Sequence, residues 1–178
     1  MKLKAAELRA STPTEQDLKL IKRNEIYIIL DNVLDTYNVG AIFRLADAVG
    51  AKKVFLCGDT EVPPNSRIKK ASVNTWQWTD WEYTSTTIEA IEILRKKVSN
   101  ITVVAVEQDA KSVKFEKFDY KLPIALIAGN ETSGISEDVL KMCDVIVELP
   151  MFGINTSLNV MVSLGIVLYK VVEQTQIL

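Results

Sequence analysis

The 178-residue sequence contains no histidine and only two cysteines. Histidine is the commonest general base and a frequent metal ligand, so any proton transfer here must use another group. Cys57 and Cys143 lie far apart and form no Cys-x-x-Cys pair. These absences predict a reduced, cytoplasmic protein without a metal site.

The chain also lacks the apolar segments that direct a protein to a membrane. Its first ten residues, MKLKAAELRA, have no apolar core of the kind found in a secretory signal. The longest apolar run, near the C-terminus, contains Ser163 and Lys170, and it is shorter than the roughly 20 residues that span a bilayer. We therefore expect no association with a membrane.

Charge of either sign is not in large excess, since the formal net charge is −2. A slightly acidic chain does not coat nucleic acid by charge alone, although it has room for a local basic patch. A hydrophobic content of 48% and a charged content of 25% are typical of globular domains. The length predicts one domain, over residues 25–178, preceded by a short N-terminal helix within residues 1–24.

Apolar runs and helical periodicity predict an alternation of strands and helices. For the N-terminal helix, Thr12 is the expected cap, Pro13 the first residue and Glu15 the partner in a capping box. The predicted strands cover residues 25–32, 52–58, 101–107, 122–129 and 144–150. The predicted helices cover residues 38–51, 86–100, 136–143 and 158 onward, and residues 59–85 are expected to be irregular.

Strands that are apolar on both faces and alternate with helices are typical of an α/β fold, a mostly parallel sheet flanked by helices. Ligands of such sheets bind at the carboxyl ends of the strands. Three predicted strand ends carry unusual polar segments: DNVLDTYNVG, AGNETSGIS and LPMFGINTSLN. The last of these leads into a helix that is apolar nearly all round from Val160 to Val172. Such a helix is buried on more than one side, which predicts a homodimer.

The three segments, in this order, resemble the motifs of the SpoU/TrmH family of RNA ribose methyltransferases, within the SPOUT superfamily. The motifs are NVGAIFRLADAVGA (38–51), ALIAGNETSGIS (125–136) and ELPMFGINTSLNVMVSLGIVLY (148–169). The resemblance implies a deep C-terminal trefoil knot that holds S-adenosylmethionine. It also implies methylation of a ribose 2′-hydroxyl in tRNA or rRNA by a homodimer whose pocket is assembled at the interface.

The resemblance assigns the cofactor to residues of the second and third motifs. Backbone groups in an apolar slot suit an adenine ring, and Gly129, Leu149, Met151 and Leu158 are the expected lining. The GINTSLNV turn would add polar groups without a fixed charge beside the sulfonium. Ser157 belongs to the active site by resemblance, but an alternative is that it only caps the last helix.

Arg44, Asn38, Glu131 and Asn159 are the other active-site residues that the resemblance implies. Arg44 lies opposite the apolar face of its helix and is either a surface arginine or a group near the ribose 2′-hydroxyl. There it would act as the base or, because a guanidinium normally stays protonated, as an electrostatic stabiliser. Asn38 is otherwise a helix cap. Glu131 would anchor its loop or pair with Arg44, or it is a turn carboxylate in water. Asn159 would join the site through amide hydrogen bonds.

A basic and aromatic stretch, NSRIKKASVNTWQWTDW, is the candidate contact for RNA. Arg67, Lys69 and Lys70 suit phosphates, whereas the three tryptophans either stack on bases or belong to the core. Where family members often have Gly-Ala, this chain has Asn74-Thr75. Two alternative functions are a non-catalytic RNA-binding dimer of the same fold and a dinucleotide-dependent oxidoreductase. The latter is disfavoured because no G-x-G-x-x-G follows the first predicted strand.

Overall fold

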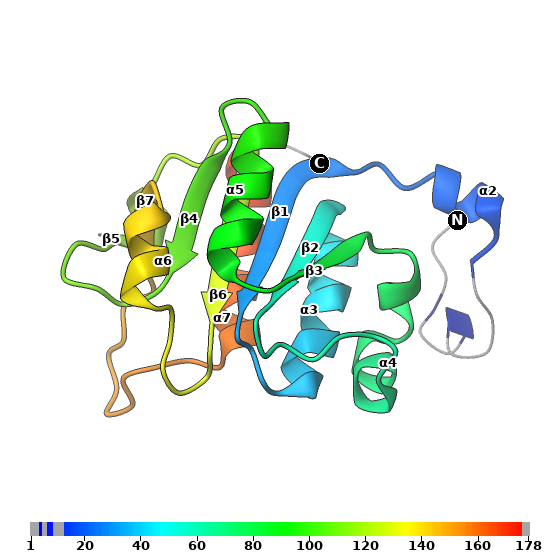
Figure 1. Cartoon of the computed structure of the whole chain (residues 1–178), viewed down its shortest axis with the longest axis horizontal. Helices are drawn as coiled ribbons and strands as arrows, with labels where there is room; N and C mark the ends of the chain where they lie inside the picture. Colours follow the sequence, from blue (N-terminus) through cyan, green and yellow to red (C-terminus); the bar gives the residue numbers. More distant parts are fainter. Residues whose placement is uncertain (1–3, 5–6, 9–12, 176–178) are drawn as a thin grey trace.

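The computed structural model describes residues 4, 7–8 and 13–175. In this part of the chain, seven parallel strands form one sheet in the order β3-β2-β1-β6-β4-β7-β5 (Figure 1). The strands are β1 (Asn24–Asp31), β2 (Ala51–Cys57), β3 (Trp81–Thr84), β4 (Thr102–Val106), β5 (Val113–Lys114), β6 (Ile124–Gly129) and β7 (Val145–Glu148). The helices are α2 (Glu15–Lys19), α3 (Thr36–Ala48), α4 (Ser66–Ser72), α5 (Thr87–Lys97), α6 (Glu137–Met142) and α7 (Val160–Thr175).

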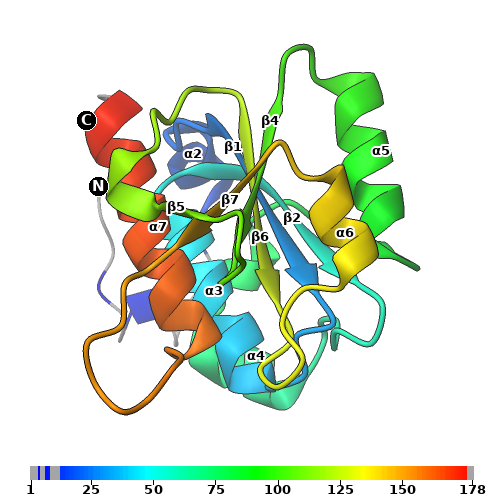
Figure 2. The ribbon, with the colours of Figure 1, turned by 90° about the vertical axis from the view of Figure 1, so that its left-hand side faces the viewer.

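Helices cover both faces of the sheet, as the predicted α/β class requires. Figure 2 shows α3 and α7 on one side of the strands and α5 and α6 on the other. Successive residues of β1 point to opposite faces, so Ile26 and Ile28 join the core under α3 and α7. Tyr27 and Ile29 join the core under α5 and α6. None of the described helices is both long and apolar enough to cross a lipid bilayer.

The register of the sheet brings the three polar strand ends together. Asp31 at the end of β1 lies opposite Gly129 at the end of β6. Strand β4 lies between β6 and β7 and pairs with both. The segments after β1, β6, β4 and β7 therefore leave the sheet side by side at its carboxyl edge.

Helix α3 is the central packing element on its face of the sheet. A Cβ built at Gly40 would lie 2.6 Å from the Cβ of Ala71 and 2.8 Å from the carbonyl oxygen of Ile68 in α4. Only a glycine allows α4 to pack this closely on α3. Gly165 of α7 meets the side chain of Leu45 on the other flank of α3, so α3 lies between α4 and α7.

The predicted strands and long helices are observed with shifts of a few residues at their ends, but several details were wrong. Helix α2 is capped by Thr14, in a capping box with Asp17; Pro13 precedes the cap, and Thr12 lies outside the described residues. Helix α3 begins two residues before Asn38, with Asp35 as its cap. Asn38 is therefore inside the helix and does not cap it.

The stretch expected to be irregular contains α4, a 3₁₀ helix (Thr75–Gln77) and β3. Only Ile68 and Ser72 of α4 are buried, which gives too little periodicity to reveal a helix of seven residues. Trp76 lies in the 3₁₀ helix, so its alternation with Trp78 does not come from a strand. Strand β5, of two exposed residues, was also not predicted.

Candidate functional site

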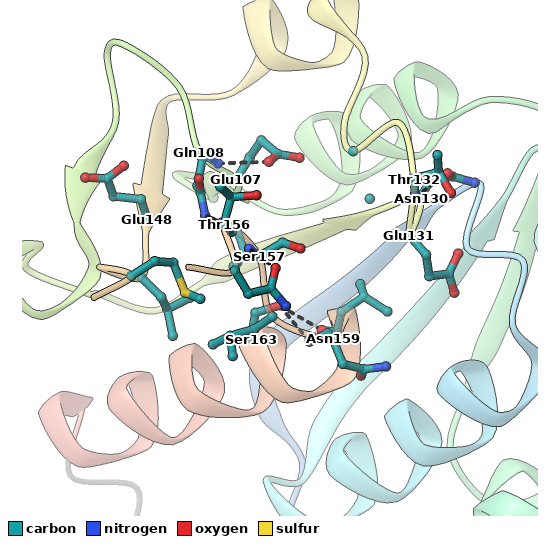
Figure 3. Close-up of a pocket in the computed structure, with 18 residues that line it drawn as sticks. Glu107, Gln108, Asn130, Glu131, Thr132, Glu148, Thr156, Ser157, Asn159 and Ser163 are labelled. Carbon is teal, nitrogen blue, oxygen red and sulfur yellow. Dashed lines mark hydrogen bonds between the residues drawn. The ribbon is translucent and has the colours of Figure 1, made fainter. Parts of the chain in front are cut away.

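A pocket of about 480 Å³ opens at the carboxyl edge of the sheet. Its walls come from the segments that follow β4, β6 and β7 and from the first turn of α7 (Figure 3). The residues that line it are Val106, Glu107, Gln108, Gly129, Asn130, Glu131, Thr132, Gly134, Glu148, Leu149, Met151, Asn155, Thr156, Ser157, Leu158, Asn159, Val160 and Ser163. A pocket of this size accommodates a nucleoside-sized ligand.

The four residues predicted to contact a cofactor all line this pocket. Leu149, Met151 and Leu158 supply apolar surface, and Gly129 ends β6 at the pocket's floor. A Cβ at Gly129 would lie 2.5 Å from the carbonyl carbon of Gly134. Glycine is therefore required where the loop after β6 folds back over the end of its own strand.

Three predicted active-site residues form one hydrogen-bonded chain between elements that are distant in sequence. The side-chain nitrogen of Asn38 donates to Glu131 Oε1 at 2.9 Å. The side-chain nitrogen of Asn159 donates to Asn38 Oδ1 at 3.0 Å. These two hydrogen bonds link the loop after β6, helix α3 and the start of α7.

Glu131 also anchors the segment that precedes α3. The backbone amides of Leu34 and Asp35 donate to its two carboxylate oxygens, each at 3.1 Å. Partial burial raises the pKa of Glu131, but the hydrogen bonds from Asn38 and from these amides outweigh it and hold the pKa below its usual range. The carboxylate is therefore ionised at neutral pH and anchors the loop, and the structure contains no Glu131–Arg44 ion pair.

Asn159, and not Ser157, caps the last helix. Asn159 Oδ1 accepts from the backbone amides of Met161 at 2.9 Å and Val162 at 3.4 Å. The backbone amide of Ser157 donates to Asn155 Oδ1 at 3.2 Å, and Ser157 lines the pocket. The alternative in which Ser157 serves only as the helix cap was wrong.

Two polar pocket residues outside the three motifs, Glu107 and Gln108, directly follow β4 and were missed in the sequence. The Glu107 carboxylate accepts from the backbone amides of Ile135 and of Gln108, each at 2.9 Å. It thereby fixes the far end of the loop after β6. An acidic residue directly after the apolar run ITVVAV was the available signal, but only the strand order shows that this end adjoins the other motifs.

The pocket is acidic, contrary to the expectation of a site without fixed charge. Three of its lining residues are glutamates, Glu107, Glu131 and Glu148, and none of the described lining residues is lysine or arginine. The GINTSLNV turn itself is uncharged, as expected, but it faces carboxylates from other segments. The local field therefore favours a cationic ligand.

Arg44 and the basic trio lie outside this pocket in the single chain. Arg44 is exposed on α3. Arg67, Lys69 and Lys70 are exposed on α4. The tryptophans are mainly structural, because Trp76 and Trp81 pack against the core and the Trp78 indole donates to Asp47 at 2.8 Å. The described residues include no cluster of three or more side chains suited to a metal ion.

These features define a class of protein, an α/β domain with an acidic, nucleoside-sized pocket where parallel strands end. Comparison with known proteins identifies the family. The model of the SpoU rRNA Methylase family matches residues 25–169, so the chain belongs to this family. The resemblance inferred from the three motifs is confirmed.

Individual relatives agree with this assignment over most of the chain. The chain is 29% identical to the tRNA (guanosine(18)-2'-O)-methyltransferase of Aquifex aeolicus, covering 87% of this chain and 72% of that protein. It is 29% identical to a 23S rRNA (guanosine-2'-O-)-methyltransferase of Ralstonia nicotianae, covering 98% and 69%. The AdoMet-bound rRNA methyltransferase of Sinorhizobium meliloti has a similar structure, with a TM-score of 0.79 and 28% identity over 96% of this chain and 60% of that one.

The anchoring role of Glu131 predicts a pH-dependent contribution to stability. Glu131→Gln replaces one acceptor oxygen by an NH₂ group that faces a backbone N–H. We expect the free energy of unfolding at pH 7 to fall by about 1 kcal/mol. This is the contribution of a hydrogen bond to a charged group, reduced because the side chain is exposed to solvent. Because the pKa is lower in the folded protein, this difference is present above the ordinary glutamate pKa and fades as the pH falls through the folded-state pKa.

Urea unfolding at a series of pH values measures this difference. Glu137→Gln is the matched control, because the Glu137 side chain is 91% exposed on α6. The account of Glu131 is wrong if its variant is as stable as the wild type at pH 7, or if the difference grows as the pH falls.

Proposed function

We propose that this protein transfers the methyl group of S-adenosylmethionine to a ribose 2′-hydroxyl of structured RNA. The observation that carries the proposal is the pocket at the carboxyl edge, which adjoins the hydrogen-bonded series Glu131–Asn38–Asn159. Membership of the SpoU rRNA Methylase family supports it. The relatives include enzymes named for tRNA and for rRNA, so both are candidate substrates.

The pocket suits the cofactor in shape and in charge. Gly129, Leu149, Met151 and Leu158 would hold the adenine ring through backbone groups and apolar contact. When bound, S-adenosylmethionine supplies an electrophilic methyl group on a positively charged sulfur. Three lining carboxylates favour that charge, whereas a dinucleotide pyrophosphate would meet no basic lining residue. The charge of the pocket thus disfavours the oxidoreductase alternative.

Asn38, Glu131 and Asn159 would act together by holding α3 and α7 in register with the loop after β6. A sugar oxygen must be aligned with the methyl carbon for in-line displacement, so positioning contributes much of the rate. Ser157 and Asn159 present polar groups at the same wall of the pocket. The segment 148–169 corresponds to the knotted part of the family fold, and a trefoil knot there remains a prediction. We assign residues 25–178 to the methyltransferase domain, in agreement with a family match that begins at residue 25.

Arg44 is the residue that we assign to the reacting sugar. A guanidinium keeps its charge at neutral pH, so Arg44 would position an RNA phosphate and stabilise the negative charge that develops on the 2′-oxygen. Since Arg44 does not line the pocket of its own chain, this role requires a pocket assembled between two copies, as the family resemblance implies.

Arg44→Ala should leave the affinity for S-adenosylmethionine unchanged and lower the rate of methyl transfer about 100-fold or more. Calorimetry measures the first quantity, and transfer of a labelled methyl group to RNA measures the second. Lys96→Ala, which removes a charge from the far side of the sheet, is the control. An unchanged rate for Arg44→Ala would refute the assignment.

The exposed side of α7 supports the proposal of a homodimer. Val162, Ile166 and Tyr169 are 40%, 37% and 54% exposed and share one face of the helix. The opposite face is buried against the sheet and α3. Leu34 and Tyr37, at the start of α3, are also exposed. A second copy of the chain would cover the exposed face of α7.

Ile166→Glu should convert a dimer into a monomer and reduce methyl transfer, because a charge would be buried at the interface. Leu20→Glu, at an exposed position after α2, should leave the dimer intact. Sedimentation equilibrium measures both masses. A wild-type protein that is monomeric at the concentrations used for activity would contradict the proposed interface.

RNA would be held by the exposed basic side chains of α4. Arg67, Lys69 and Lys70 project from a helix that packs directly on α3, the helix that carries Arg44. Phosphates bound at α4 would therefore lie near the element that carries the reacting group. The tryptophans contribute mainly by keeping this part of the chain folded.

Alanine at each of these three positions should weaken RNA binding and reduce the slope of log affinity against log salt concentration by about one. Filter binding over a range of salt concentrations measures the slope, with Lys96→Ala again as the control. If the triple variant binds RNA with the same salt dependence as the wild type, the interface lies elsewhere.

A further inference from the structure

Residues 149–159 connect β7 to α7 and form one wall of the pocket. Within the described structure, no backbone–backbone hydrogen bond involves residues 151–158. Phe152 is 93% exposed and Ile154 is fully exposed. A wall with so few backbone hydrogen bonds to the body of the domain depends on side-chain contacts to keep its shape.

One side chain from outside this segment supplies a contact. The Gln108 side-chain nitrogen donates to the carbonyl oxygen of Thr156 (Figure 3). Among the hydrogen bonds of the described residues, this is the only one that joins residues 151–158 to another part of the chain. Since Gln108 and Thr156 both line the pocket, the bond joins two segments of its lining.

The backbone of Gln108 is held in place by the sheet and by the loop after β6. Its backbone amide donates to Glu107 Oε1 at 2.9 Å. Glu107 is bonded through its own amide to Val147 of β7 at 3.1 Å and through Oε2 to the amide of Ile135 at 2.9 Å. The position of Gln108 is therefore set by the sheet and by the loop after β6, and not by the segment that it holds.

We infer that Gln108 is a positioning residue that holds residues 149–159 in place beside the end of β4 before the cofactor binds. The bond keeps Thr156, Ser157 and Leu158 in the conformation that forms the cofactor wall. A wall that is already ordered loses less conformational entropy when the cofactor binds. The bond therefore raises the affinity for the cofactor and does not change the rate of the chemical step. The identity of the ligand rests on the proposed function.

Gln108→Ala tests this inference. We expect the Kd for S-adenosylmethionine to rise about fivefold, the effect of losing one neutral hydrogen bond. The rate of methyl transfer at saturating cofactor should be unchanged, because the hydrogen-bonded series Glu131–Asn38–Asn159 is untouched. General structural damage would lower that rate as well. Gln77→Ala, at an exposed glutamine in the 3₁₀ helix, is the control for removing an amide side chain.

Hydrogen exchange of the ligand-free protein gives a second measurement that does not depend on the cofactor. The Ser157 amide, which donates to Asn155 Oδ1, should exchange faster in Gln108→Ala than in the wild type, while the amides of α7 keep their rates. Gln108→Glu keeps the length of the side chain but removes the donor, so it should speed exchange of the same amide. Equal exchange in all three proteins, or a wild-type Kd in Gln108→Ala, would overturn the inference. A wild-type protein that binds no S-adenosylmethionine would instead refute the proposed function. The hydrogen-exchange measurement would still test the role of Gln108, because it does not depend on the cofactor.

Discussion

The carboxylate of Glu131 is the point at which separate parts of the chain meet. It holds the backbone ahead of α3 through two amides and the side chain of Asn38 through a third hydrogen bond. Because the lowered pKa keeps this group ionised at neutral pH, it remains an acceptor for all three donors. Together with Asn130, whose side-chain nitrogen donates to the carbonyl oxygen of Asn32 at 2.8 Å, it ties the loop after β6 to the segment that leads into α3.

The other wall of the site depends on this arrangement. Asn38, held by Glu131, accepts from Asn159, and Asn159 in turn caps α7. The same helix carries the exposed apolar face through which we propose that two copies associate. Side chains near the strand ends thus couple three features: the cofactor wall, the start of α7 and the proposed dimer interface. This coupling explains why polar residues gather where the sequence is otherwise apolar.

Much of this organisation is visible in the sequence, because each central strand is a continuous apolar run followed by a polar segment. The site residues within these segments were named from the resemblance to the SpoU/TrmH motifs. The sequence does not show that β4 lies between β6 and β7, so Glu107 and Gln108 were missed and the acidity of the pocket was not foreseen. Capping was also misjudged: Ser157 and Asn159 are both good caps, and only the backbone geometry identifies Asn159. Helix α4 escaped prediction because packing on α3, and not its own periodicity, stabilises it.

The central claim is that this pocket directs a methyl group to a ribose oxygen. Its most direct test is to map ribose methylation in tRNA and rRNA from cells with and without the gene, and to repeat the transfer with purified protein and labelled S-adenosylmethionine. The account predicts at least one 2′-O-methylated nucleotide that is absent without the gene and is restored by the purified protein. An unchanged methylation map, together with no transfer of label to ribose, would contradict it.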